Sequence, residues 1–213
     1  MSAPLRIDIV SDVVCPWCII GYLQLEQALR DTGVAHDIHW HPFELNPDMP
    51  PEGQDLRDHI AQKYGATREQ SDQTRAQLAA LGADLGFVFA YGDGARMYNT
   101  FDAHRLLQWA GTLRQKHALK LALFRAYFTD GRDVSDHETL CQVAAAVGLD
   151  AEAAAQVLRD GGFAQEVRGL EAFWARQGVQ GVPGMVFDGK HLVTGAQGAD
   201  NYAQILTHLT RAA

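Results

Sequence analysis

The sequence predicts an α/β protein whose sheet-containing part is interrupted by a large all-helical insertion. Three observations lead to this prediction. The N-terminal region shows the pattern of a strand, a helix and a strand, and the C-terminal region that of a hairpin followed by a helix. The long stretch between them shows mainly helical periodicity, and it is too long for a loop inside a compact domain. We therefore expect one discontinuous domain formed by residues 1–46 and 178–213, and a helical insertion domain formed by residues 47–177.

The first three elements form a predicted parallel crossover unit. Leu5–Val10 alternates apolar and polar residues, as a strand does. Pro16 suits the first position of a helix, which makes Cys15 the N-cap residue and Gly33 a plausible stop. His36–Phe43 alternates again and predicts a second strand. A strand, a helix and a strand of these lengths are typical of a parallel pair.

The residue pattern changes from alternating to helical after a proline-rich segment, residues 46–51, which we take as the domain boundary. Thr67 with Gln70, and Ser135 with Glu138, fit capping boxes at two helix starts. Apolar residues recur at three- and four-residue intervals in five segments: Ala76–Leu85, Phe101–Gln115, Leu119–Phe128, Leu140–Val147 and Ala151–Leu158. The short apolar run at residues 87–90 fits neither a helix nor a strand clearly.

Strand signals return near the C-terminus. Gly184–Phe187 and His191–Thr194 flank Asp188-Gly189, a dipeptide that favours a tight hairpin turn. Asp200–Thr210 then carries apolar residues on one side and predicts an amphipathic closing helix. These elements complete the sheet-containing domain.

The composition is that of an ordinary globular protein, and it excludes several kinds of partner. The 213 residues include 18 Lys and Arg against 26 Asp and Glu, a net charge of −8. Without a basic run, nucleic acid and anionic membranes are poor candidates. No apolar stretch has the length of a membrane helix, and Asp8 and Asp12 interrupt the one stretch that resembles a secretory signal. We therefore expect a cytoplasmic protein that does not associate with membranes.

The cysteines carry the strongest chemical signal. An odd count of three excludes a disulfide scaffold and a four-cysteine metal site. Cys15 and Cys18 lie three residues apart in Cys-Pro-Trp-Cys at a helix start, where unpaired N–H groups and the helix dipole favour a thiolate. We expect Cys15 to be an exposed nucleophile with a lowered pKa, and Cys18 a buried resolving thiol. Pro16 and Trp17 lie between them, and Trp17 would shield the site and offer a flat apolar surface.

Several residues near this motif have a plainer interpretation. Half of a zinc site is one alternative for the cysteine pair, but no suitable second half is visible, so we expect no metal. Cys141 lies on an apolar helix and is expected to be a buried, inert thiol. Asp8 or Asp12 could accept the proton of the resolving thiol, although solvated or capping carboxylates are more common at strand ends. His39 and His41 share one strand face and are expected to be surface or packed histidines rather than metal ligands.

Val182-Pro183 is the second informative feature. A proline directly before an apolar strand and after two glycines suits a tight turn with a cis peptide bond. By itself the pattern fits a merely rigid turn equally well. It becomes more specific in combination with the cysteine pair.

Together these motifs resemble the DsbA family of the thioredoxin superfamily, and within it the cytoplasmic FrnE-like branch. The supporting segments beyond Cys-Pro-Trp-Cys are residues 42–47, residues 99–106, and residues 181–183 with 186–189. The resemblance implies a thioredoxin-like fold whose helical insertion caps the active site. It also implies a cis Pro183 beside the cysteines, with Val182 offering backbone hydrogen bonds to an extended substrate.

The resemblance further implies substrate-binding roles for four residues: Phe43, Asn46, Asn99 and His104. Asn99 and His104 would face the cleft from the insertion, although a histidine on the helix surface or capped in the core is an equally good interpretation of His104. Gly184-Met185 departs from the branch pattern, in which bulkier apolar residues are expected, and this leaves the pocket shape beside Pro183 open.

The implied function is thiol-disulfide oxidoreduction on a protein or small molecule that contains a thiol or a disulfide. A sister group of glutathione-dependent transferases and 2-hydroxychromene-2-carboxylate isomerases typically has serine at the position of Cys15, so the cysteine pair favours disulfide chemistry. An isomerase or transferase, and a binding module switched by redox state, remain the alternatives. We expect no cofactor, while glutathione could serve as a thiol substrate. An apolar face of the insertion could support a homodimer.

Overall fold

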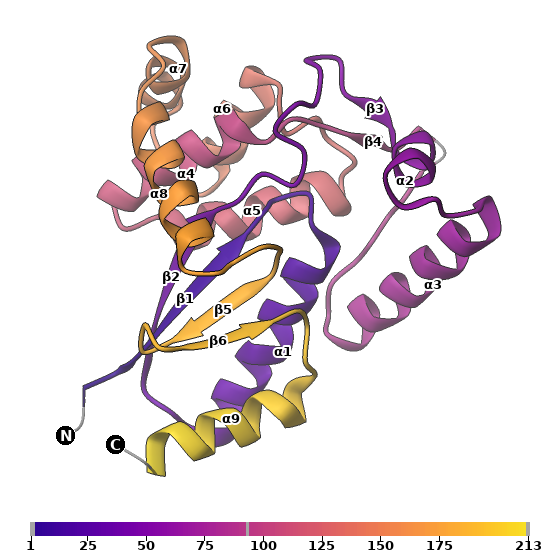
Figure 1. Cartoon of the computed structure of the whole chain (residues 1–213). Helices are drawn as coiled ribbons and strands as arrows, with labels where there is room; N and C mark the ends of the chain where they lie inside the picture. The colour runs from indigo at the N-terminus through magenta and orange to yellow at the C-terminus, as the bar shows by residue number, and fades with distance from the viewer. Residues whose placement is uncertain (1–2, 93, 212–213) are drawn as a thin grey trace.

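A four-stranded mixed sheet forms the centre of the fold in the computed structural model, which describes residues 3–92 and 94–211 (Figure 1). The strand order is β2-β1-β5-β6. β1 (Leu5–Ser11) pairs in parallel with β2 (His36–Pro42) and antiparallel with β5 (Gly184–Phe187), and β5 pairs antiparallel with β6 (His191–Thr194). Both ends of the chain therefore contribute neighbouring strands to one sheet, as the sequence predicts for a thioredoxin-like fold.

Helix α1 (Pro16–Thr32) connects β1 to β2 and confirms the predicted crossover. Cys15 is its N-cap residue and Pro16 its first residue, while Gly33 ends it in the left-handed conformation, at φ 65°. Glycine suits that position because it has no Cβ to clash with the backbone. Helix α9 (Ala199–Arg211) packs along α1 and closes the same face of the sheet.

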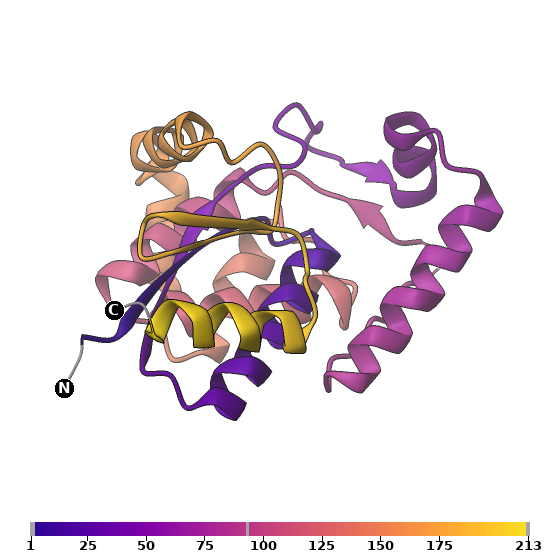
Figure 2. The ribbon, with the colours of Figure 1, turned by 60° about the horizontal axis from the view of Figure 1, so that its bottom comes forward.

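The two faces of the sheet bury different partners because side chains alternate along a strand. Ile7 and Ile9 of β1 pack in the main core with α1 and α9, whereas Val10 belongs to a smaller cluster with Trp174. Trp174 lies on α8 (Ala164–Arg176), and Figure 2 shows α8 on one side of the sheet and α1 with α9 on the other.

The segment between β2 and β5 is mainly helical, as predicted. It also contains a ribbon of two-residue strands, β3 (Gln54–Asp55) and β4 (Arg96–Met97), which are too short to produce a visible alternation. Besides α8, its helices are α2 (Leu56–Tyr64), α3 (Arg68–Asp84), α4 (Phe101–Thr112), α5 (Lys116–Phe128), α6 (His137–Ala146) and α7 (Ala151–Arg159). No helix within residues 3–92 and 94–211 has the length and apolar character needed to cross a membrane.

The two predicted capping boxes have different outcomes. Thr67 and Gln70 exchange side-chain and backbone hydrogen bonds at the start of α3, as predicted. The second prediction was wrong, because the N-cap of α6 is Asp136. Its carboxylate accepts the backbone N–H of Thr139, while the hydroxyl of Ser135 donates to Asp133. Two adjacent capping residues compete here, and the carboxylate one position later takes the cap.

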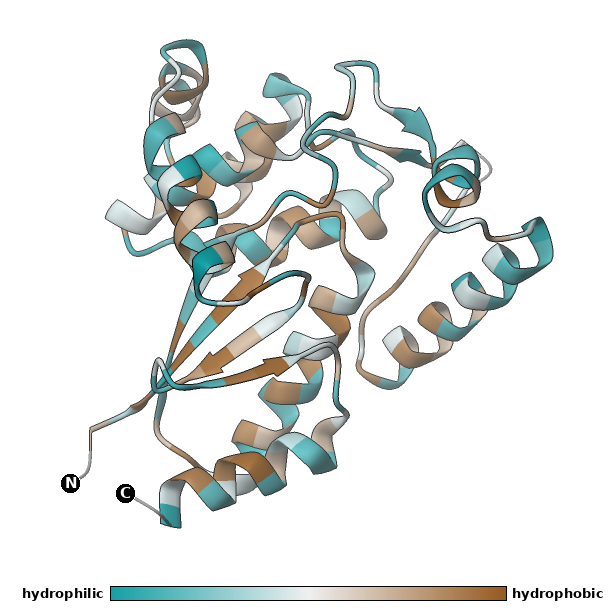
Figure 3. Cartoon of the chain, in the orientation of Figure 1, coloured by the Kyte–Doolittle hydropathy of each residue, from teal (hydrophilic) through white to brown (hydrophobic). Residues whose placement is uncertain are grey.

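Helix α3 is held by the apolar run whose structure the sequence left open. Residues 87–90 are irregular, and the rings of Phe87 and Phe89 pack against Phe128 of α5, with centroids 6.3 and 5.0 Å away. The approach to α3 requires glycine at position 82, since a Cβ there would lie 2.6 Å from the ring of Phe89. Figure 3 shows that α2 and α3 are otherwise largely hydrophilic, in contrast to the strands of the central sheet.

Candidate active site at the N-terminus of α1

The two cysteines of the motif occupy the first turn of α1. Cys15 has an extended backbone, with φ −92° and ψ 111°, and the N–H of Cys18 donates to its carbonyl at 3.1 Å. Both are free thiols in this structure, and their exposed fractions are 3% and 0%. This places two thiols that can be oxidised to a disulfide together at a helix N-terminus.

Cys15 is buried, so the prediction of an exposed thiol with a lowered pKa was wrong for this structure. Burial raises the pKa of Cys15 well above its usual range, and a hydrogen bond with the Cys18 side chain raises it further. The Cys15 thiol donates to the carbonyl of Val182 at 3.8 Å. The helix N-terminus favours a thiolate, but the removal of water from the sulfur outweighs it here.

The Val182–Pro183 peptide bond is cis, as the family resemblance implies. Pro183 accepts a hydrogen bond from the N–H of Gly195 at 2.8 Å, which ties this turn to the segment after β6. A Cβ on Gly21 would lie 3.3 Å from the Pro183 ring, so a glycine in α1 allows the helix to pass close to the turn. The turn thereby lies beside Cys15, with the carbonyl of Val182 already directed at its sulfur.

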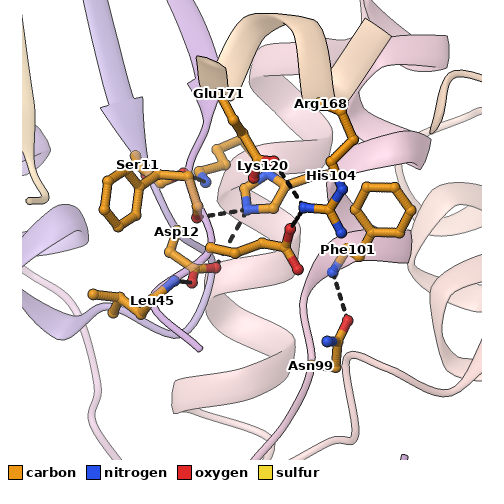
Figure 4. Close-up of polar contacts among 11 residues, drawn as sticks. Ser11, Asp12, Leu45, Asn99, Phe101, His104, Lys120, Arg168 and Glu171 are labelled. Carbon is orange, nitrogen blue, oxygen red and sulfur yellow. Dashed lines mark hydrogen bonds and ion pairs between the residues drawn. The ribbon is translucent and has the colours of Figure 1, made fainter. Parts of the chain in front are cut away.

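A buried polar cluster lies behind the cysteines, and Figure 4 shows its contacts. Asp12 is fully buried and accepts hydrogen bonds from the N–H of Leu45 at 2.7 Å and from Nε2 of His104 at 3.3 Å. Burial alone would raise the pKa of Asp12. The hydrogen bonds from His104 and Leu45, together with the charge of Lys120, outweigh burial and lower it. Asp12 is therefore a buried, ionised carboxylate.

Lys120 is the functional candidate that the sequence analysis missed. It lies on α5, is 1% exposed, and donates from Nζ to the carbonyl of Ser11 at 3.3 Å (Figure 4). Burial lowers the pKa of Lys120 to about 8, against the attraction of Cys18, Asp12 and Cys15. A signal was available, because Lys120 lies one turn before Phe124 on the buried face of an apolar helix, where a lysine needs an explanation.

The other aspartate serves a different part of the molecule. Asp8 is also buried rather than solvated, and it pairs with Arg6 at 2.8 Å and with His41 at 2.7 Å. It is two residues from Val10 and so faces α8, on the side of the sheet opposite to α1. Burial would raise the pKa of Asp8, but the hydrogen bonds and charges of Arg6 and His41 outweigh burial and lower the pKa.

Cys141 is half-buried at the edge of the core rather than fully buried as expected.

A cavity of about 350 Å³ opens on the cysteine motif. Cys15, Pro16, Trp17 and Val182 line one side, and residues of α2, α3 and α5 line the other. The indole of Trp17 is 40% exposed at this cavity. The lining is mainly apolar, and a substrate that occupies it would meet Cys15 directly.

The four residues that the resemblance implies as substrate-binding fall in different places. Asn46 lines the cavity, and its side-chain oxygen accepts a hydrogen bond from Lys63 at 2.6 Å. The side chain of Phe43 packs in the small cluster with Trp174. Asn99 accepts the N–H of Phe101 at 2.9 Å near the start of α4, and buried His104 also donates to the carbonyl of Phe43 at 3.0 Å. Phe43, Asn99 and His104 are absent from the cavity lining in the described part of the chain.

Comparison with solved structures supports the fold and its family. A probable DsbA oxidoreductase from Streptomyces coelicolor is similar, with 36% identity and a TM-score of 0.90 over 97% of this chain and 90% of that chain. The cytosolic disulfide reductase DsbM from Pseudomonas aeruginosa is 19% identical, with a TM-score of 0.68 over 98% of this chain and 100% of that chain, and a second structure of it contains GSH. A 2-hydroxychromene-2-carboxylate isomerase is 17% identical, with a TM-score of 0.69 over 97% of this chain and 95% of that chain.

The last two likenesses, both below 25% identity, show a shared fold. The family model of the DSBA-like thioredoxin domain matches residues 6–207, which covers almost the whole chain. That range includes the cysteine pair, the cis-proline turn and every helix of the insertion. The chain therefore belongs to the DSBA-like thioredoxin domain family, a family of thiol oxidoreductases.

Proposed function

We propose that the protein is a thiol-disulfide oxidoreductase in which Cys15 attacks and Cys18 resolves. The observation that carries this proposal is the cysteine pair in the first turn of α1, beside the cis Val182–Pro183 turn and open to a cavity. The N-cap position of Cys15 gives it the helix N–H groups that stabilise a thiolate. Cys18 is fully buried, and its side chain is hydrogen-bonded with that of Cys15.

The reaction proceeds in two exchanges. The Cys15 thiolate attacks one sulfur of a substrate disulfide, so a Cys15–substrate disulfide forms, the substrate S–S bond breaks and one thiolate leaves. The Cys18 thiolate then attacks the Cys15 sulfur, and the second substrate thiolate leaves. The substrate gains two electrons and the protein dithiol becomes a disulfide, which an external thiol reductant must reduce again.

The buried cluster would receive the proton of Cys18 during the second exchange. Asp12 is ionised, and Lys120 has a pKa of about 8 and lies close enough to be attracted by both cysteines. Neutral Lys120 can accept a thiol proton, because its pKa is close to that of a thiol, and as a cation it then stabilises the thiolate that remains. The charge of ionised Asp12 favours that protonated form of Lys120. Together they let Cys18 act without contact with water.

We further propose that the pair works mainly as a reductant. In this structure the Cys15 thiol donates to the Val182 carbonyl, and burial raises the pKa of Cys15, so burial outweighs the stabilisation that the helix N-terminus gives the thiolate. A dithiol whose thiolate is poorly stabilised passes its electrons on readily, whereas strong oxidants stabilise their reduced form. The expected reduction potential is more negative than about −200 mV.

The proposed substrates are small thiols and disulfides, and the proposed location is the cytoplasm. The cavity beside Cys15, about 350 Å³, suits a small molecule or a short peptide segment. The Pseudomonas relative that shares this fold is a cytosolic disulfide reductase with a GSH-bound structure, which supports the same class of substrate here.

A glutathione-dependent isomerase or transferase is the second candidate. A 2-hydroxychromene-2-carboxylate isomerase shares the fold, and the largely apolar cavity could hold an aromatic substrate. The cysteine pair distinguishes the two, because isomerisation does not require a resolving thiol. Isomerase activity that survives in Cys15→Ser would favour this second candidate.

The two exchanges can be separated with cysteine variants. Reduced Cys18→Ser, mixed with oxidised glutathione, should accumulate a disulfide between Cys15 and one glutathione, because no resolving thiol remains. Wild type should instead release both glutathiones and form the Cys15–Cys18 disulfide, and Cys15→Ser should do neither. Mass spectrometry of the intact proteins distinguishes the products.

The matched control is Cys141→Ser, which should behave as wild type. A stable adduct on Cys141, or an equal reaction of Cys15→Ser, would refute the assignment of Cys15 as the nucleophile.

A further inference from the structure

One cation in the cavity beside Cys15 has no hydrogen-bond partner for part of its guanidinium. Arg75 projects from α3 into the cavity, and its Nη2 atom is buried without a partner among the described residues. Buried N–H groups are nearly always satisfied, and an unpaired one on a charged group is especially unfavourable. The unsatisfied donor therefore points to a group that Arg75 binds when the cavity is occupied.

The surroundings of Arg75 hold it in place without neutralising it. Its guanidinium carbon lies 5.4 Å from the centre of the Tyr91 ring, a cation–π distance that leaves N–H donors available. Asp72, one turn earlier on α3, pairs with Arg57 at 2.6 Å instead. A cation that is oriented by a ring and has no carboxylate partner among residues 3–92 and 94–211 is suited to receive an anion.

The cavity has one sign of charge. Among its lining residues in the described part of the chain none is Asp or Glu, although the whole chain has a net charge of −8. Burial lowers the pKa of His59, which also lines the cavity, so this side chain is neutral at pH 7. Arg75 therefore sets the charge of the cavity, in a lining that is otherwise apolar or neutral.

We propose that Arg75 binds a carboxylate of the substrate, so that this cavity selects small disulfides that carry a carboxylate beside an apolar or aromatic body. The inference rests on the proposed function, since it concerns the substrate of the same cysteine pair. Arginine and carboxylate form two parallel charge-assisted hydrogen bonds, which orient a ligand as well as hold it. Arg75 is then a specificity-determining residue at the end of the cavity formed by α3, with Cys15 at the other side.

The reaction balances for such a substrate. The reduced Cys15–Cys18 pair and one aromatic disulfide give the Cys15–Cys18 disulfide and two aromatic thiols, with two electrons passing to the substrate. The carboxylate does not react, so a neutral disulfide follows the same steps without the contact to Arg75.

Single-turnover kinetics with two chromogenic disulfides test the proposal. Reduced wild type is mixed with 5,5′-dithiobis(2-nitrobenzoic acid), which carries two carboxylates, or with neutral 4,4′-dithiodipyridine. In Arg75→Gln the rate constant for the dicarboxylate disulfide should fall by about tenfold, which is the value of one lost charge-assisted contact. The rate constant for the neutral disulfide should change by less than about twofold. Arg75→Lys keeps the charge without the planar pair of donors, so its rate constant for the dicarboxylate disulfide should lie between those of wild type and Arg75→Gln.

Arg68→Gln is the matched control. It removes one positive charge from the same helix, at an exposed position outside the cavity lining. It should leave both rate constants unchanged, so a fall there would mean that net charge rather than Arg75 controls the rate. Equal changes for both disulfides in Arg75→Gln, or none for either, would overturn the proposal.

A binding measurement separates this inference from the proposed function. In Cys15→Ser, which cannot attack a disulfide, NMR titration with 4-nitrobenzoate should give a dissociation constant about tenfold lower than titration with 4-nitrobenzamide, and Arg75→Gln should remove the difference. If the carboxylate binds selectively but wild type does not react with disulfides, the redox function is refuted and the carboxylate site is supported. If wild type reacts with disulfides but binding is not selective, the carboxylate site is refuted and the redox function is supported.

Discussion

Lys120 is the residue through which the helical insertion acts on the cysteines. Its ammonium is buried between the carbonyl of Ser11 and two aromatic rings, with Nζ 5.5 Å from the centre of Trp40 and 4.9 Å from that of Phe124. Its pKa of about 8 reflects an environment that opposes the charge, and the attraction of the two cysteines partly restores it. The cation and the thiolates therefore stabilise one another.

Replacement of Lys120 should make the cysteine pair less reactive at neutral pH. In Lys120→Met the thiolates lose the stabilising charge of the lysine. The pH–rate profile for the alkylation of Cys15 by iodoacetamide should therefore move to higher pH, and the rate at pH 7 should fall by about tenfold. The pH–rate profile of alkylation measures this. Lys116→Met is the control, because the pKa of Lys116 is also about 8 through burial, but no cysteine contributes to it. An equal displacement of both profiles would contradict the assignment to Lys120.

Glu44 gives the fold a pH dependence that is independent of the cysteines. It is buried two residues after the end of β2, between Arg168 and Glu171 of α8. Burial and the charge of Glu171 raise the pKa of Glu44 to about 7, although Arg168 opposes the shift. The folded state thus holds a proton that the unfolded chain, with a pKa near 4.5, has lost. This contribution to stability is complete below the unfolded pKa and is lost as the pH rises to about 7 and above.

Glu44→Gln should remove this loss of stability at rising pH. The free energy of unfolding of wild type should fall between pH 4.5 and 7.5 by about 2 kcal/mol more than that of the variant, which has no proton to lose at this site. Urea unfolding across this range measures the difference. The control is Glu152→Gln on α7, where the carboxylate is exposed. An unchanged slope in Glu44→Gln would show that the carboxyl titrates normally.

At the scale of elements, α3 defines one wall of the cavity and depends on a close contact. The Phe87–Phe89 segment passes over Gly82, where an added Cβ would lie 2.7 Å from the carbonyl of Phe87 and 2.6 Å from the ring of Phe89. The same helix carries Arg75. The position of Arg75 relative to Cys15 therefore depends on how closely this segment packs on α3.

Gly82→Ala should destabilise the protein by about 1–3 kcal/mol, because the new methyl group must displace an aromatic ring or backbone. It should also weaken the preference for the carboxylate disulfide, since α3 must move. Gly169→Ala in α8 is the control, with open space around the added Cβ, and it should stabilise by about 0.5–1 kcal/mol. Thermal unfolding of both variants measures these changes in stability. A Gly82→Ala variant as stable as wild type would contradict the close packing of this segment on α3.

Elements with a local cause were predictable from the sequence. Proline at the start of α1, glycine at its end, and Asp188-Gly189 in the hairpin act within a few residues, and each appears where predicted. The ribbon of β3 and β4 has no such signal, since two residues cannot alternate visibly and the partner strand lies about 40 residues away. The N-cap at Asp136 rather than Ser135 shows the limit of local rules where two capping residues are adjacent.

At the scale of the whole molecule, the site is assembled from segments far apart in the sequence. Cys15, Lys120 and Val182 come from the first sheet segment, the insertion and the return to the sheet. The burial of Cys15 and its raised pKa arise from this assembly, so a motif that indicates an exposed thiolate could not reveal them. The boundaries of the two domains, at residues 46/47 and 177/178, and the assignment to the FrnE-like branch stay predictions.

The central claim is that Cys15 and Cys18 form a reversible dithiol–disulfide couple. The most direct test equilibrates the protein with set ratios of reduced and oxidised glutathione, alkylates the free thiols and counts them by mass spectrometry. We predict one two-electron transition, more negative than about −200 mV, in which two alkylatable thiols disappear and reappear together while Cys141 stays reactive throughout. A protein that keeps three alkylatable thiols at every ratio, or that only accumulates glutathione adducts, would contradict the account.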